Sequence, residues 1–180
     1  MTNSVPLNKL AAYCQAKQGA IYAQNVEKGW HDDERSFAQF ACLFHSEVSE
    51  GVEGLRKILM DTHLKDLPML VVEMADVYIR ILDYTGSKGI GWDDGITEWR
   101  VTDDRPTDLA NLHACLSEAW LQRGNLFQNY QLQRAAILAW RIVEAEGHDM
   151  AAIVDAKLAY NKTRPDHMKA ARDADGGKKW

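Results

Sequence analysis

Residues 67–84 read LPMLVVEMADVYIRILDY, and this stretch decides the fold class because its side chains are almost continuously apolar. Pro68, which a helix tolerates in its first turn, marks the beginning, and Gly86 marks the end. We therefore predict a helix that is mostly buried. Two of its acids, Glu73 and Asp76, lie in its most apolar part, LVVEMADVYIRIL, and a buried carboxylate is costly unless a cation or a proton compensates its charge.

The rest of the chain also follows helical periodicity, and its four prolines fall where helices would begin or end. Ser36 and Gln39 predict a capping box, while Gly29 and Thr107 are expected to end and to begin helices. No segment shows convincing strand alternation. The sequence thus predicts an all-α helical bundle, with helices at residues 7–28, 36–60, 67–84, 107–122, 132–146 and 150–162.

A weak internal repeat suggests two similar halves. His45 and Glu50 recur 68 residues later as His113 and Glu118, and the third predicted helix aligns with the fifth at an offset of 58. Chance similarity between amphipathic helices explains the pattern equally well. In this alignment, the second half has no counterpart of the acids Glu47, Glu73 and Asp76, whose places are taken by Cys115, Gln131 and Arg134.

We accordingly predict a single domain over residues 1–180, possessing only one site that could hold a metal ion. Residues 1–98 form its metal-binding half, residues 99–165 a degenerate second helix-pair half, and residues 166–180 a mobile tail.

Composition narrows the classes of partner. The formal charge of −5 argues against nucleic-acid binding, which needs clustered Lys and Arg. The three cysteines are far apart, so they indicate no disulfide framework. The N-terminus lacks the apolar centre of a signal peptide, and no later run is long enough to span a membrane. We expect a soluble cytoplasmic protein of a bacterium or a phage.

Two pairs of acids carry the chemistry. Glu47 and Glu50 lie three residues apart on the second predicted helix, and Glu73 and Asp76 have the same spacing on the third. Residues so spaced share a helix face, so antiparallel packing through the turn at residues 61–66 could bring the pairs together. Four carboxylates suit Mg²⁺, with Mn²⁺ as a substitute.

Each acid also has an ordinary structural explanation. E-x-x-E is a common surface pattern, and Arg80 could neutralise Asp76 from one turn away. Glu53 extends the first row and is either an outer metal ligand or a solvated partner of Lys57.

A third cluster, Lys157, Asn161 and Arg164, precedes Pro165 near the end of the last long helix. These groups could bind phosphate and sugar oxygens. Basic residues are also favoured at helix C-termini by the helix dipole. If the two acid pairs were absent, the dipole alone would explain these basic residues.

The chain resembles the MazG-like members of the all-α nucleoside triphosphate pyrophosphohydrolases. The resemblance covers most of residues 20–98 and 149–180, while residues 99–146 depart from the short members of that family. It rests on the ordered stretches EKGWHDDERSF at 27–37, HSEVSEGVEGLRK at 45–57, EMADVYIRILDYTG at 73–86 and KLAYNKTRPDH at 157–167.

The resemblance implies hydrolysis of a nucleoside triphosphate, expected to be a deoxynucleotide, between its α and β phosphates. It implies that the magnesium ligands are Glu47, Glu50, Glu73 and Asp76, and among these we choose Glu50 as the general base. It places Asn25, Trp30 and His31 beside the nucleotide, although Trp30 could equally clasp two helices together. It further implies a homodimer or homotetramer, in which the second half of this chain could replace one partner.

Two other functions stay open. The dipeptides His31-Asp32 and His148-Asp149 are the signature of HD-type metal phosphohydrolases, although no spacing of further histidines supports that class. A non-catalytic helical interaction module would use the acids as a solvated face or a regulatory metal site.

Overall fold

Helix α3 (Met69–Ser87) occupies the centre of the molecule and contacts α1 (Leu7–Glu27), α2 (Phe37–Lys57), α5 (Leu126–Ala145) and α6 (Met150–Thr163). Most of its residues are buried, including the acids Glu73 and Asp83, while Asp76 is half-buried. The continuous run of apolar side chains explains this position, because a helix that is apolar on all sides must be covered on all sides.

The computed structural model describes residues 4–92, 100–167 and 169–176. These residues add α4 (Arg105–Leu121), the short 3₁₀ helix η1 (Pro165–His167) and α7 (Lys169–Asp173). They contain no strand beyond one isolated bridge between Met60 and Pro68, so the predicted all-α fold is confirmed. None of the described helices is both long and apolar enough to span a bilayer.

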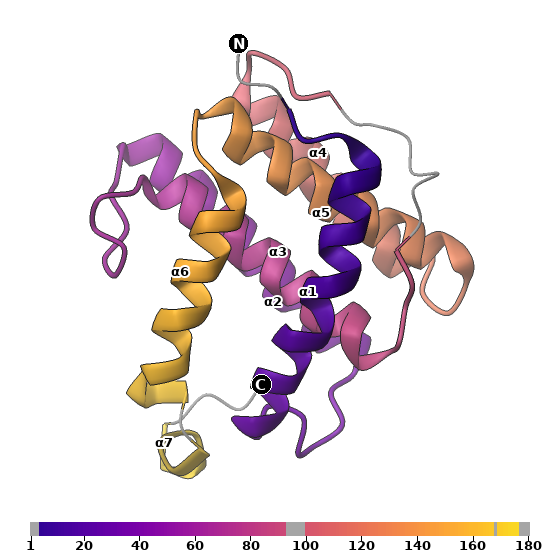
Figure 1. Cartoon of the computed structure of the whole chain (residues 1–180), viewed down its shortest axis with the longest axis vertical. Helices are drawn as coiled ribbons and strands as arrows, with labels where there is room; N and C mark the ends of the chain where they lie inside the picture. The colour runs from indigo at the N-terminus through magenta and orange to yellow at the C-terminus, as the bar shows by residue number, and fades with distance from the viewer. Residues whose placement is uncertain (1–3, 93–99, 168, 177–180) are drawn as a thin grey trace.

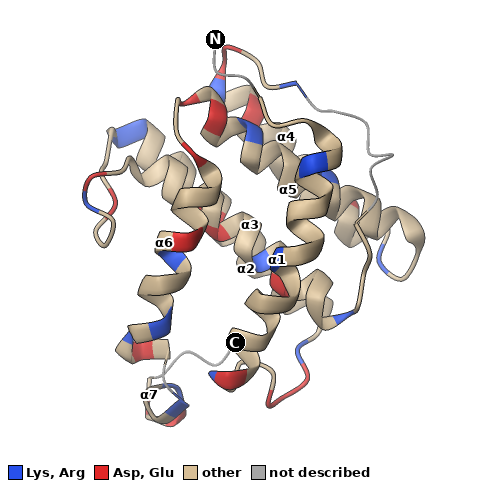
Figure 2. Ribbon diagram, viewed as in Figure 1, with Lys and Arg blue, Asp and Glu red and all other residues tan. Residues whose placement is uncertain are grey.

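Two antiparallel hairpins, α2–α3 and α4–α5, pack against each other, with α2 on α4 and α3 on α5. Figure 1 shows α1 and α6 lying in front of these hairpins, on the side nearer the viewer. Both front helices contact α3, which therefore lies between the second hairpin and the two front helices. Charged residues of both signs are interspersed over the ribbon in Figure 2.

Local signals in the sequence predicted several helix ends correctly. The Ser36 hydroxyl accepts a hydrogen bond from the Gln39 backbone N–H, and the Gln39 side chain accepts one from the Ser36 backbone N–H, as in the expected capping box. Gly29 follows α1 with a φ of 73°, the left-handed conformation that favours glycine.

Four predicted helix boundaries are wrong. Helix α3 continues through Gly86 to Ser87 instead of ending at residue 84. Helix α2 ends at Lys57 rather than at residue 60, because Ile58 turns left-handed with a φ of 55°. Helix α4 begins at Arg105, and Thr107 lies inside it, where its hydroxyl donates to the Asp104 carboxylate over 2.5 Å. Helix α5 begins six residues early, after Asn125, whose side chain accepts from the Phe127 N–H.

The segment predicted as a tail contains short helices at residues 165–167 and 169–173. Arg172 on α7 anchors this segment by donating to the Lys28 carbonyl over 2.7 Å. Residues 177–180 lie outside the described part of the chain.

Candidate metal centre

Two glycines on α2 allow α3 to approach it closely. A Cβ atom on Gly54 would lie 2.9 Å from the Cβ of Met69, and one on Gly51 would lie 2.8 Å from the terminal methyl of Met74. Since hydrogen replaces a side chain at both positions, the α2 face that carries Glu47 can lie against the face of α3 that carries the other acids.

Glu47, Glu73 and Asp76 meet at this contact. One carboxylate oxygen from each lies within 4.8 Å of the other two, and the described residues contain no other such group of three potential metal ligands. Glu47 is 6% exposed and Glu73 is 5% exposed. We name these three side chains the acid group.

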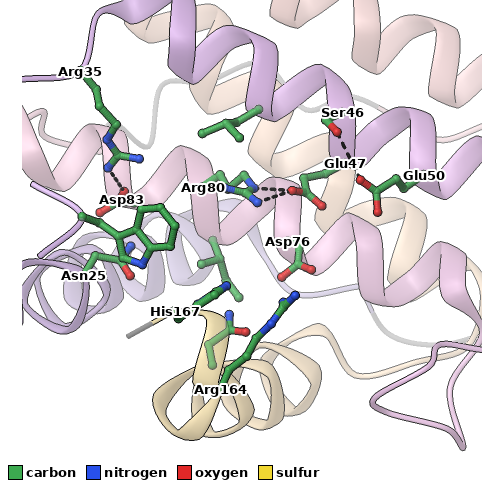
Figure 3. A pocket seen from close by; sticks show the side chains of 14 residues that line it. Asn25, Arg35, Ser46, Glu47, Glu50, Asp76, Arg80, Asp83, Arg164 and His167 are labelled. Carbon is green, nitrogen blue, oxygen red and sulfur yellow. Dashed lines mark hydrogen bonds and ion pairs between the residues drawn. The ribbon is translucent and has the colours of Figure 1, made fainter. Parts of the chain in front are cut away.

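Glu50 lies outside the acid group, although the sequence places it among the metal ligands. Its side chain is exposed and accepts a hydrogen bond from the Ser46 hydroxyl over 3.2 Å (Figure 3). It therefore faces the same space as the acid group without sharing its burial. Glu53 is also not part of the acid group, because its carboxylate pairs with Arg56 and Lys57 on the exposed side of α2.

Two cations accompany the acid group. Arg80 places Nε and Nη2 each 2.5 Å from Oε1 of Glu47, and Lys157 of α6 places Nζ 2.8 Å from Oδ2 of Asp76. The structural alternative, an ion pair between Arg80 and Asp76, is therefore not the one that forms. Lys157 from α6 forms an ion pair with Asp76, and Arg80 forms one with Glu47 from α2.

The acid group is under electrostatic strain. Burial, together with the nearby Asp76 and Glu47 carboxylates, raises the pKa of Glu73 to about 9. Burial also raises the pKa of Asp76 to about 6, although Lys157 opposes that rise. Oε2 of Glu73 is buried without a hydrogen-bond partner among the described residues. A bound cation would supply the compensation that this oxygen lacks.

A cavity of about 320 Å³ opens beside the acid group, within the size range of small-molecule sites. Figure 3 shows labelled side chains from α1, α2, α3 and the C-terminal segment surrounding this space. Its wall combines acids with cations, amides and aromatic rings: Glu47, Glu50, Asp76, Asp83, Arg35, Arg80, Arg164, Asn25, Asn161, Trp30 and His167.

The predicted basic cluster divides between the acid group and the cavity. Lys157 is only 3% exposed and is held by Asp76. Asn161 and Arg164 line the cavity, and the side-chain oxygen of Asn161 is buried with no partner in the described part of the chain. Helix α6 is also held against the turn between α2 and α3. The His63 ring stacks on Tyr160, and its Nδ1 shares a 2.9 Å hydrogen bond with the Tyr160 hydroxyl.

At the other end of the cavity, Asn25 and Trp30 line the wall as expected, but His31 does not contribute to it. The His31 ring lies behind, with Nε2 2.8 Å from Oδ1 of Asp83, and Arg35 donates to the same carboxylate over 3.1 Å. His31 therefore orients a cavity residue rather than reaching the cavity itself.

Sequence reasoning missed Arg35, His167 and Arg172. The Arg172 guanidinium lies 4.1 Å from the Trp30 ring centroid, and His167 meets the same indole edge-on at 5.4 Å. These residues belong to a loop and to the C-terminal segment, where no periodic pattern marks a site.

The His-Asp dipeptides have other partners. Asp149 accepts from the backbone N–H groups of Ala151 and Ala152 at the start of α6, and Asp32 pairs with Lys169. Neither dipeptide joins the acid group, so the geometry adds no support for HD-type chemistry.

Comparisons of this chain with protein-family models, with curated proteins and with solved structures found no match. Its membership of the pyrophosphohydrolase family therefore stays a prediction from the sequence motifs.

Proposed function

We propose that the protein is a metal-dependent nucleoside triphosphate pyrophosphohydrolase, which converts a triphosphate and water to the monophosphate and pyrophosphate. One observation carries the proposal: three crowded carboxylates, of which Glu73 has an unpartnered buried oxygen, lie beside a cavity. Glu47 and Asp76 line that cavity together with arginines, amides and an indole. Buried acids favour a cation, and a cavity with these groups suits an anionic ligand that has a planar ring.

The acid group fits Mg²⁺ or Mn²⁺. Both are hard cations that bind carboxylate oxygens and leave positions for water and phosphate oxygens. When bound, such an ion would neutralise phosphate charge and acidify an attacking water.

The chain's own residues would align the substrate. Arg164 offers a planar guanidinium for phosphate oxygens, while Asn161 offers an amide to phosphate or sugar. Lys157 is buried against Asp76 and would hold that carboxylate in place. Glu50 is open to the cavity and unused by the acid group, so it can accept the proton of the attacking water.

The length of the cavity suits a nucleoside beyond the phosphates. Asp76 and Asp83 both line it, and seven residues of helix separate their Cα atoms by about 10 Å along α3. Trp30 and Asn25 line the wall with Asp83, where an indole can stack on a base and an amide can read its edge. We expect a deoxynucleoside triphosphate as substrate.

The proposal is tested by incubating the protein and Mg²⁺ with a panel of ribo-, deoxy- and modified nucleoside triphosphates and identifying products by ³¹P NMR. We expect pyrophosphate and a monophosphate from at least one of them. Asp76→Asn and Glu50→Gln should each lower kcat at least about a hundredfold. Matched controls are Asp155→Asn and Glu53→Gln, which alter acids on exposed faces of α6 and α2.

Other results would identify the alternatives. Release of single phosphate or of inorganic triphosphate would point to HD-type chemistry. No product from any triphosphate, with Mg²⁺ or Mn²⁺, would favour the helical interaction module. Full activity in Asp76→Asn, with an unchanged helical circular dichroism spectrum, would contradict the proposed centre.

A further inference from the structure

Arg80 occupies a position between the acid group and the cavity. Its guanidinium binds Oε1 of Glu47 through two nitrogens, both at 2.5 Å, and it also lines the cavity wall. Its side chain is 37% exposed, whereas the Glu47 side chain is 8% exposed. Arg80 therefore covers a buried carboxylate from the cavity side (Figure 3).

We propose that Arg80 is an exchangeable internal cation: it neutralises Glu47 while the centre is empty, and it moves to the substrate phosphates when a divalent cation binds Glu47. This inference rests on the proposed function, because it concerns the same centre and the same class of substrate. It adds a residue that serves both the empty and the occupied site.

The first step follows from charge. In the acid group, Glu47 lies within 4.8 Å of Glu73 and Asp76, so a divalent ion bound among the three would lie close to the Arg80 guanidinium. A divalent cation and a guanidinium repel each other at short range, and both are attracted to the Glu47 carboxylate. The ion and the guanidinium therefore compete for one carboxylate.

Arg80 is the cation that can leave. Lys157, the other positive group, has a side chain only 4% exposed and is held by Asp76 at 2.8 Å. Separating Lys157 from Asp76 would leave the lysine ammonium buried without a partner, which is costly. Arg80 already reaches the cavity, so its guanidinium can rotate from Glu47 into that space and remain paired there.

The cavity offers Arg80 a destination once the substrate is present. Arg164 lines the same wall as Arg80, and in Figure 3 both point toward the space beside Asp76. A guanidinium binds two phosphate oxygens in a fixed planar arrangement, which lysine does not match. Phosphates held between Arg80 and Arg164 would replace the ion pair that Arg80 gives up.

The test separates metal binding from turnover. Mn²⁺ is titrated without nucleotide and the free ion is followed by electron paramagnetic resonance, while kcat is measured with the best substrate. Arg80→Ala should bind Mn²⁺ about fivefold more tightly, since one competing ion pair is removed. The same variant should lose about a hundredfold in kcat, and Arg80→Lys should recover part of that loss. Arg56→Ala, which removes an exposed charge on α2, should change neither quantity.

Different failures have different meanings. Unchanged or weaker Mn²⁺ binding in Arg80→Ala, with the fold verified by circular dichroism and by the lysine variant, would overturn the exchange, because Arg80 would then merely hold Glu47 in place. Tighter binding with undiminished kcat would overturn the move to phosphate. A wild-type protein that bound no Mn²⁺ would overturn the metal centre and this inference together. Tighter Mn²⁺ binding without any turnover would overturn only the proposed reaction and would still support the competition for Glu47.

Discussion

Glu73 bears the highest electrostatic cost in the acid group. It is 5% exposed, it lies beside two other carboxylates, and one of its oxygens has no partner among the described residues. Its pKa of about 9 means that the empty protein keeps a proton on this carboxyl at neutral pH. The residue is thus poorly suited to stabilising the fold and well suited to exchanging a proton for a cation.

This cost predicts how stability depends on pH. The pKa of Glu73 is raised above the ordinary 4.5, so the folded state binds a proton more tightly than the unfolded state does. Its contribution to stability is present below about pH 4.5 and is lost as the pH rises toward about 9. In EDTA, Glu73→Gln should melt roughly 5 °C higher than wild type at pH 8 and show a flatter pH dependence.

The measurement is thermal unfolding at several pH values, with and without Mg²⁺. The exposed substitution Glu53→Gln serves as the control and should follow wild type. Mg²⁺ should raise the melting temperature of wild type but not of Glu73→Gln. If the melting temperature of Glu73→Gln changed with pH as steeply as that of wild type, a group other than Glu73 would be responsible for the pH dependence.

Sequence alone located the acids but not their pairings. Glu73 and Asp76 could be singled out because a helix as apolar as α3 must bury them. The exclusion of Glu50 depends on how far α2 is rotated against α3, since residues three apart on a helix still differ in direction by about 60°. The Arg80–Glu47 pair joins two helices, and no local pattern encodes such a contact.

At the scale of helices, the approach of α2 to α3 determines the geometry of the acid group. Gly54 and Gly51 both lie at this contact, yet their neighbours differ in mobility. A Cβ on Gly54 would meet the Cβ of Met69 and the backbone N of Leu70, at 2.9 and 3.1 Å. A Cβ on Gly51 would meet chiefly the terminal methyl of Met74, which can move.

The two glycines therefore form a matched pair of variants. Gly54→Ala should destabilise the protein by about 1–3 kcal/mol, because α3 must shift away. Gly51→Ala should be close to neutral, since alanine also favours a helix over glycine. Urea unfolding measures both effects, and Mn²⁺ binding should weaken only in Gly54→Ala. Equal losses in the two variants would contradict the idea that backbone contact at Gly54 sets the helix spacing.

The helices themselves were predictable where local chemistry decides. The capping box of α2 and the glycine after α1 involve residues within a few positions of each other. The start of α5 was missed because Leu126 and Phe127 are exposed by 85% and 65%, so they do not follow the periodicity of a buried face. The helical C-terminal segment depends on its contact with Trp30, which lies far away in sequence.

At the scale of the whole molecule, the two hairpins pack against each other, α2 on α4 and α3 on α5. His45 and His113, which correspond in the alignment, place their Nδ1 atoms 2.8 Å apart with nearly parallel rings. Positions equivalent to the acid group also gather in the second hairpin. Arg134 lies close enough to oppose the burial that raises the pKa of Cys115, and it donates to Gln131 over 3.2 Å. That trio contains no carboxylate and offers no matching metal centre.

The second hairpin packs against α2–α3, and the acid group and Lys157 are all supplied by one chain. The predicted homodimer or homotetramer would then be an association of complete sites. The contact between α3 and α6 is the main support for a complete site in each chain, because Lys157 pairs with Asp76 from a helix about 80 residues later in the same chain.

Complementation between two impaired chains tests this arrangement. Asp76→Asn and Lys157→Ala should each lower turnover about a hundredfold. When the two variants are coexpressed with different tags and purified together, activity should stay low, because one half of each Lys157–Asp76 pair is missing in every chain. Light scattering on the same sample gives the oligomeric state, which ensures that mixed assemblies were present. Recovery of a large part of wild-type turnover would show instead that α6 of one chain completes the centre of another, and the acid group would then belong to an obligate oligomer.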